Sequence, residues 1–135
     1  MKTLTACLIL IASIQLEAQQ FTLITEGEIA TDTTNTNGAS FVDYDHDGDL
    51  DVFLTNANRP LGFNTLYRND GNDHFVKVDA GEVTHLQTAT FGHSWGDYDN
   101  DGRIDLFVVN AFTNIGSLLY KNLGKDQFQR NENYD

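Results

Sequence analysis

The feature that most constrains this chain is an internal duplication. Residues 38–57 lie over residues 92–111 at an offset of 54 positions. After a one-residue slip, residues 66–69 match residues 119–122. Three further positions then match in order, Gly71, Asp73 and Phe75 against Gly124, Asp126 and Phe128. A repeat of this length predicts supersecondary units that bury their apolar faces against one another.

A third trace of the same pattern lies upstream. Phe21, Gly27 and Glu28 precede their counterparts Phe75, Gly81 and Glu82 by the same 54 positions. We therefore expect residues 19–37 to contain the closing strand of a preceding unit and a polar linker. Residues 38–91 then form the first complete repeat and residues 92–135 the second.

Each repeat predicts four short β-strands. Apolar and β-branched runs separated by Gly, Asn, Asp and Pro turn signals place the strands. They fall at residues 39–44, 51–55, 65–68 and 74–79 in the first repeat, and at 94–98, 105–109, 117–121 and 127–130 in the second. Beyond residue 18 we find no window of helical periodicity. The predicted fold is all-β, a partial β-propeller of two four-stranded antiparallel blades plus the closing strand of another.

Both repeats contain the spacing D-x-D-x-D-G-x-x-D. The aspartates at positions 1, 3, 5 and 9 are Asp43, Asp45, Asp47 and Asp51, and in the second repeat Asp97, Asp99, Asp101 and Asp105. Alternate residues of a curled loop point to the same side, so each loop can gather several carboxylates. Calcium takes about 6–8 oxygen ligands in flexible geometry, which this arrangement can supply.

The remaining loop positions fit the same interpretation. Gly48 and Gly102, at position 6, permit a sharp turn. Position 7 is Asp49 (carbonyl) or Arg103 (carbonyl), where the backbone oxygen is the expected ligand because the side chain points outward. Magnesium is disfavoured by its octahedral demand and zinc by the all-oxygen set. The sequence therefore predicts two Ca²⁺ sites.

Two other interpretations of these loops are weaker. An EF-hand needs a Glu at position 12 and flanking helices, but position 12 is Leu54 or Val108 inside an apolar run. A solvated acidic turn explains one such loop more easily than two at the same place in a repeat. Four ionised carboxylates this close repel one another without a cation, so we expect bound metal to stabilise the fold.

The N-terminus predicts export. Residues 1–18 have a positive start, an apolar run and a small residue before the expected cleavage point, which is the pattern of a secretory signal peptide. The apolar run is shorter than the ~20 residues of a membrane span. Cys7, the only cysteine, lies inside this segment. We expect a secreted chain, at an extracellular, periplasmic or cell-surface location, without disulfides.

The net charge of −12 excludes whole classes of partner. No basic patch is present for a phosphate backbone, so nucleic acid is not an expected partner. Anionic membrane surfaces are disfavoured for the same reason. The motifs of nucleophilic hydrolases and phosphate-binding loops are absent from the sequence. His85 and His93 do not recur between the repeats and have no partner nucleophile, so we expect no enzymatic activity.

The acidic loops, the L-Y-[RK]-N segments at residues 66–69 and 119–122, and the G-x-D-x-F that follows each resemble the FG-GAP or VCBS repeat. This is the calcium-binding blade of integrin α-like propellers, and residues 92–102 look closest to bacterial proteins that join such repeats to an ASPIC/UnbV domain. The resemblance implies a seven-bladed propeller with calcium in hairpin loops and an extracellular adhesion role. With about two units, this chain looks like a fragment of such a propeller.

Three functions remain open from the sequence. The leading hypothesis is a calcium-binding module that recognises an extracellular protein or glycan. The second is the non-catalytic propeller part of a secreted carbohydrate-active or other hydrolytic enzyme, and the third is a calcium-rigidified spacer. The long loops at residues 58–64 and 110–116 contain one charged residue, Arg59, which favours binding over catalysis. Exposed blade faces are also expected to permit self-association.

Overall fold

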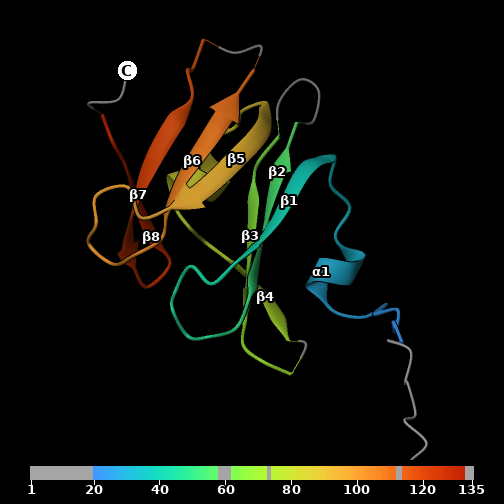
Figure 1. The fold of residues 1–135 in the computed structure, drawn as a ribbon. Helices are drawn as coiled ribbons and strands as arrows, with labels where there is room; N and C mark the ends of the chain where they lie inside the picture. The colour runs from blue at the N-terminus through green and yellow to red at the C-terminus, as the bar shows by residue number, and fades with distance from the viewer. Residues whose placement is uncertain (1–19, 58–61, 73, 112–113, 133–135) are drawn as a thin grey trace, which may run out of the picture.

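The computed structural model describes residues 20–57, 62–72, 74–111 and 114–132. The predicted signal peptide, residues 1–18, lies outside these ranges. In the described chain the strands form two four-stranded antiparallel sheets, each a simple meander (Figure 1). The first contains β1 (Thr36–Val42), β2 (Asp51–Asn56), β3 (Thr65–Asn69) and β4 (Phe75–Val78). The second contains β5 (Thr90–Gly96), β6 (Asp105–Asn110), β7 (Leu118–Gly124) and β8 (Gln127–Arg130).

This architecture confirms the predicted all-β fold with two propeller-like blades. The duplication extends to the strand register. Phe41 pairs with Val52 in the first blade, and Trp95 pairs with Leu106 in the second. The register shift between Thr36 and Gly38 recurs 54 positions later, between Thr90 and Gly92. In each meander, strands that follow one another in the chain pair antiparallel.

The first strand of each blade starts and ends earlier than predicted. The prediction of 39–44 and 94–98 ran to Tyr44 and Tyr98, whereas β1 ends at Val42 and β5 at Gly96. The reason is a side chain. The backbone N–H groups of Tyr44 and Tyr98 donate to the carboxylates of Asp51 and Asp105, at 3.1 Å in both loops, instead of continuing the ladder.

The segment before β1 differs from the prediction. Residues 20–27, expected to include the closing strand of a preceding blade, form no strand. A single helical turn, α1 (Glu28–Thr31), follows Gly27, and its counterpart α2 (Glu82–His85) follows Gly81. The upstream trace is therefore structurally equivalent as well. Helices of four residues are too short for periodicity to reveal.

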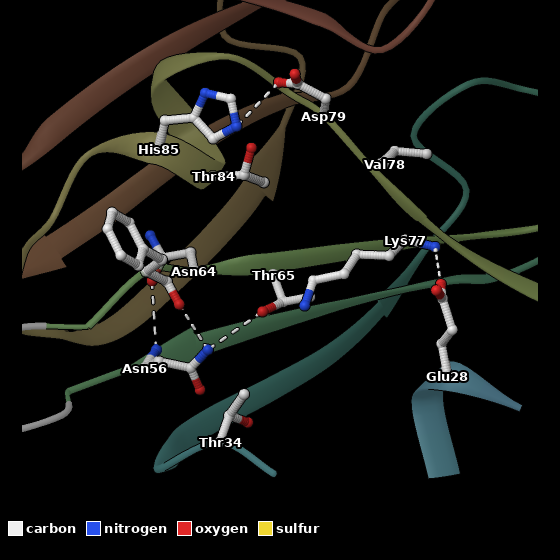
Figure 2. A pocket seen from close by; sticks show the side chains of 11 residues that line it. Glu28, Thr34, Asn56, Asn64, Thr65, Lys77, Val78, Asp79, Thr84 and His85 are labelled. Atoms are coloured by element: carbon white, nitrogen blue, oxygen red, sulfur yellow. Dashed lines mark hydrogen bonds and ion pairs between the residues drawn. The ribbon is translucent and has the colours of Figure 1, made fainter. Parts of the chain in front are cut away.

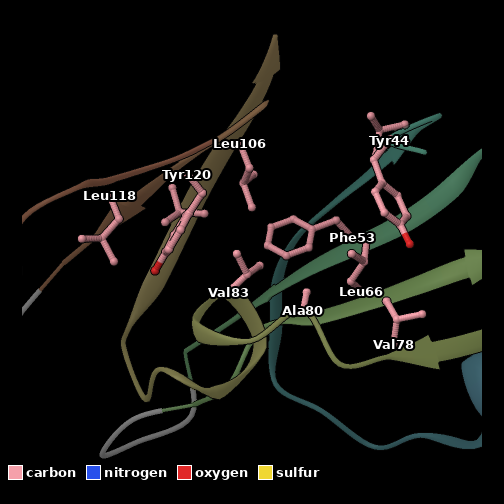
Figure 3. Packing of buried hydrophobic residues seen from close by; sticks show 11 residues of the cluster. Tyr44, Phe53, Leu66, Val78, Ala80, Val83, Leu106, Leu118 and Tyr120 are labelled. Atoms are coloured by element: carbon pink, nitrogen blue, oxygen red, sulfur yellow. The ribbon is translucent and has the colours of Figure 1, made fainter. Parts of the chain in front are cut away.

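The core lies between the two sheets and includes the linker that joins them. Figure 3 shows Ala80 and Val83, from the segment around α2, between Phe53 and Leu66 of the first blade and Leu106 and Tyr120 of the second. The other buried members of this cluster are Val42, Tyr44, Val78, Val108 and Leu118. Because α2 contributes Val83 at 1% exposure, the linker helps to hold the blades together.

Two equivalent aromatic residues, Trp95 and Phe41, lie in different surroundings. Trp95 on β5 contacts the first blade, edge-on to Phe53 at 5.4 Å, and its indole N–H donates to Ser40 Oγ at 3.1 Å. The hydroxyl of Ser40 is also 2.7 Å from His93 Nε2. Phe41, the counterpart of Trp95, is 70% exposed. Aromatic residues at equivalent positions of a repeat are expected to pack alike in the core. For Phe41 that expectation is wrong, because its side of β1 faces away from the second blade.

Candidate metal centres

The two acidic loops occupy equivalent places in the blades. Each connects the first strand of its sheet to the second, residues 43–50 between β1 and β2 and residues 97–104 between β5 and β6. Figure 1 shows both connections on the same side of the molecule, below and to the left of the sheets. Positive φ angles turn each loop back at positions 4 and 6, with His46 at 63° and Gly48 at 96°, and Asn100 at 61° and Gly102 at 87°.

Three carboxylates converge in each loop. One oxygen each from Asp43, Asp45 and Asp51 lie within 4.8 Å of one another. The same holds for their counterparts Asp97, Asp99 and Asp105. Oxygen ligands on opposite sides of a calcium ion are about 5 Å apart, since each lies ~2.3–2.6 Å from the metal. Both clusters therefore have the spacing that one divalent ion can bridge.

The position-9 aspartates have a second role in the strands themselves. Asp51 is fully buried, and its two oxygens accept N–H groups from Tyr44 at 3.1 Å and Asn69 at 2.9 Å. These donors lie just beyond β1 and at the end of β3, so one carboxylate joins three strands. Burial raises the pKa of Asp51 to about 6. Asp105 repeats the arrangement, accepting from Tyr98 and from Asn122 at 2.8 Å, and burial raises its pKa as well.

The first loop has a carboxylate oxygen with nothing to satisfy it. Asp43 Oδ1 is buried and has no hydrogen-bond partner in the described chain. Burial and the neighbouring carboxylate of Asp47 raise the pKa of Asp45. An unpaired buried carboxylate oxygen costs free energy unless a cation or a proton compensates it. The donor set, all carboxylate oxygen, suits a hard cation, so these residues fit a bound metal.

The second loop already holds cations from its own chain. Lys121 Nζ lies 2.8 Å from Asp101 Oδ2 and also pairs with Asp99. Arg103 pairs with Asp101 through its guanidinium and donates from Nε to the carbonyl oxygen of Asn122 at 2.7 Å. The hydrogen bond from Lys121 lowers the pKa of Asp101, and this contact with Asp101 likewise raises the pKa of Lys121.

The other predicted ligands lie at the rim of the loops. Asp47 Oδ1 accepts the backbone N–H of Asp49 at 2.8 Å, and Asp101 Oδ1 accepts that of Arg103 at 3.0 Å. Neither carboxylate belongs to the convergent trio of its loop. Ligation by these two aspartates, and by the position-7 carbonyls of Asp49 and Arg103, stays a prediction.

Alternation along each loop predicts that position 4 points outward, and His46 and Asn100 are exposed. The same alternation predicts that Leu50 and Ile104 enter the blade core. Ile104 packs against the core cluster, but Leu50 is 55% exposed, so that prediction is wrong for the first loop. Leu50 lies in the blade whose outer face, marked by Phe41, has no second blade against it.

Sequence reasoning missed the asparagines that position the loops. Asn69 Nδ2 donates to the carbonyl oxygen of Leu50 at 3.2 Å, and Asn122 Nδ2 donates to that of Ile104 at 3.0 Å. Asn122 Nδ2 also reaches across to the carbonyl oxygen of Tyr44 at 2.8 Å. The signal was present, since both asparagines end the repeated L-Y-[RK]-N segment. Nothing in the spacing, however, indicated that the segment lies beside the acidic loop.

Comparison with known families agrees with this geometry. The model of the FG-GAP-like repeat matches residues 43–108, a range that starts at the first aspartate of the first loop and ends in β6 of the second blade. No curated protein matches the chain. Within the ranges that the structure describes, no helix is long and apolar enough to cross a bilayer.

Proposed function

This chain contains an FG-GAP-like repeat, matched over residues 43–108, and on that premise we propose that it is a secreted, calcium-dependent recognition module without enzymatic activity. Its ligand would be an extracellular protein or glycan. Calcium would bind in two sites, one in each acidic loop, and hold the strands of each blade in place.

One observation carries the calcium assignment. The convergent carboxylate trio occurs twice at equivalent positions, and in the first loop it includes the buried, unpaired Asp43 Oδ1. A single acidic turn is common on protein surfaces. Two copies built on the same strand register are better explained by a shared ligand, and a carboxylate cage with room for irregular geometry favours calcium over magnesium.

Export is supported by the N-terminal pattern of residues 1–18. A recognition role rather than catalysis is supported by the histidines. His93 Nε2 is bonded to Ser40 between the blades, and burial lowers the pKa of His93. Contrary to the sequence expectation, His93 therefore has a hydroxyl beside it, but its buried Nδ1 has no partner in the described chain that would orient the ring as a general base. His85 lies 3.4 Å from Asp79, with no nucleophile paired to it among the described residues. These contacts support a role without catalysis.

Calcium titration by calorimetry tests the proposal. We expect two ions per chain, with Asp45→Ala and Asp99→Ala each retaining one ion and the double variant retaining none. Excess chelator should lower the melting temperature of the unsubstituted chain, because the binding free energy contributes to folding. Two full-affinity sites in Asp45→Ala, or a melting curve insensitive to chelator, would contradict the assignment.

A further inference from the structure

A cavity lies in the first blade at the end opposite its acidic loop. Its volume is about 770 Å³, within the range of small-molecule sites. It is bounded by the last residue of β2, the first of β3 and the last of β4, whereas the acidic loop precedes β2. None of the loop aspartates lines it. The lining residues are Glu28, Thr34, Asn56, Phe63, Asn64, Thr65, Lys77, Val78, Asp79, Thr84 and His85.

The polar groups of this cavity face it from several elements. Figure 2 shows Asn56, Asn64 and Thr65 on one side, Glu28 on another, and Asp79 with His85 on a third. Asn64 is only 6% exposed, and its Oδ1 is held by the backbone N–H of Asn56 at 3.3 Å. Its Nδ2 makes no hydrogen bond in the described chain. A nearly buried amide with a donor left over is a fixed recognition group.

Two carboxylates of the cavity are held by backbone N–H groups, and each has a second oxygen that can accept a hydrogen bond from a ligand. Glu28 Oε2 accepts the backbone N–H of Lys77 at 3.2 Å, and Asp79 Oδ1 accepts that of Gly81 at 3.0 Å. The second oxygen of each has no partner in the described chain. Phe63, a residue that is 51% exposed, adds an apolar surface. Amide donors and carboxylate acceptors around an exposed aromatic ring match the hydroxyls and C–H faces of a sugar.

The cavity is not a by-product of the repeat. The second blade has the backbone equivalents of the first, but Phe63, Asn64 and Thr65 correspond to residues 116–118, which read Gly-Ser-Leu. The ring and the amide are thus missing there, and the remaining position is apolar. The side chains that line this cavity are therefore not dictated by the repeat.

The charged residues that line the cavity favour some classes of ligand over others. Glu28 and Asp79 line the cavity in a chain of net charge −12. The ammonium group of Lys77 is already paired with Asp32 at 2.7 Å. Asp79 lies 3.4 Å from His85, whereas Glu28 has no ion pair in the described chain. An anionic ligand would meet the charge of Glu28 and the second oxygen of Asp79, which costs free energy. Resting on the proposed recognition role, we propose that this cavity binds a neutral saccharide, its ring stacked on Phe63 and its hydroxyls bonded by Asn64, Glu28 and Asp79.

The test uses an array of neutral and acidic oligosaccharides, probed with the calcium-loaded chain and followed by saturation-transfer NMR on the neutral oligosaccharides that bind. We expect at least one neutral oligosaccharide to bind, with saturation on its ring C–H protons. Phe63→Ala should lower the affinity at least tenfold. Phe91→Ala is the matched control, because Phe91 is exposed to a similar extent, 47%, and does not line the cavity.

Three results would overturn the inference: no neutral oligosaccharide bound, binding only of acidic ones, or equal binding by Phe63→Ala and the unsubstituted chain. Calcium calorimetry on the same preparation separates this inference from the proposed function. Two bound ions with no bound saccharide reject the cavity assignment alone. Bound saccharide with no bound calcium rejects the calcium assignment and leaves the cavity site standing.

Discussion

The two acidic loops share a backbone but differ in charge. Residues 43–51 contain five aspartates and no Lys or Arg, whereas residues 97–105 contain four aspartates and Arg103. The residue that follows the tyrosine of L-Y-[RK]-N also behaves differently. Lys121 turns into the second loop and pairs with Asp99 and Asp101. Its counterpart Arg68 turns away, to Asp70 at 2.7 Å and to Asp126 at 2.9 Å.

The two loops therefore differ in how the repulsion between their carboxylates is offset. The second loop neutralises part of its charge with side chains of its own blade. The first loop keeps an unpaired buried oxygen at Asp43 and a carboxyl at Asp45 with a raised pKa. Calcium affinity rises with the number of charged ligands in a site. The first loop should therefore bind calcium more tightly and depend on it more.

The largest expected effect concerns the position-9 aspartates, which make the same backbone contacts in both loops. Asp51→Ala and Asp105→Ala each leave two backbone N–H groups without their carboxylate acceptor, and we expect each to lower the free energy of unfolding by ~2–4 kcal/mol in the presence of chelator. Urea denaturation measures the loss. Asp47→Ala, at an exposed rim position, should cost less than ~1 kcal/mol. A large difference between the two position-9 variants would mean that the strands rely on these carboxylates unequally.

The second prediction tests where the loops differ. We expect the first loop to bind calcium about tenfold more tightly than the second, a difference of ~1.4 kcal/mol. Calcium must displace Lys121 from Asp99 and Asp101, so Lys121→Gln should tighten the second site severalfold. Calorimetry on loop-specific variants resolves the two affinities. Arg68→Gln is the matched control and should leave the first site unchanged, because Arg68 contacts no aspartate of that loop's trio. Equal affinities in the unsubstituted chain would remove the distinction.

Much of this arrangement followed from sequence because duplication fixes it. The register, the hairpin loops and the position-9 aspartates recur at one offset, and any fold that satisfies one copy must satisfy both. The differences between the two blades could not be predicted from the repeat. Whether Arg68 or Lys121 turns toward its loop depends on which acceptor lies within reach. For Arg68 that acceptor is Asp126 of the neighbouring blade, 58 positions later in the chain.

The repeat also does not predict which residues on the faces of the blades are exposed. Phe41 and Trp95 are equivalent in sequence and register, yet one is exposed and the other contacts Phe53. Their difference comes from which side of the blade has a neighbour, which is a property of the packed pair and not of the repeat. The cavity beside Asn64 was missed for a related reason, since its lining is drawn from α1, three strands and α2.

A smaller effect is expected at the second position of each loop. Tyr44 is 2% exposed and donates its hydroxyl to Asp126 of the other blade, whereas Tyr98 is 42% exposed. Tyr44→Phe should cost ~1–2 kcal/mol, since it leaves a partly buried carboxylate short of a donor. Tyr98→Phe should stay within ~0.5 kcal/mol of the unsubstituted chain. Urea denaturation in chelator compares them, and equal costs would show that the contact between blades adds no stability.

The smallest expected effect is that of Asp32, the residue after α1, and it depends on pH. Asp32 accepts hydrogen bonds from Lys77 and Tyr67, whereas its counterpart 54 positions later, after α2, is Leu86. The hydrogen bond from Lys77 lowers the pKa of Asp32 below its ordinary value of 3.8. A lowered pKa means that the folded chain favours the ionised carboxyl, so its contribution is present at neutral pH and is lost as the pH falls through that lowered value.

Asp32→Asn should therefore lower the free energy of unfolding by ~0.5 kcal/mol at pH 7, the size of a largely exposed ion pair. The difference between Asp32→Asn and the unsubstituted chain should shrink below about pH 4, where the unfolded carboxyl takes up its proton. Urea denaturation of both chains in chelator, at a series of pH values, measures that difference while the titration of the other aspartates cancels. A difference that stays constant down to pH 2 would assign the effect to packing instead of charge. Leu86→Asn, which changes the equivalent position without removing a charge, should give such a constant difference.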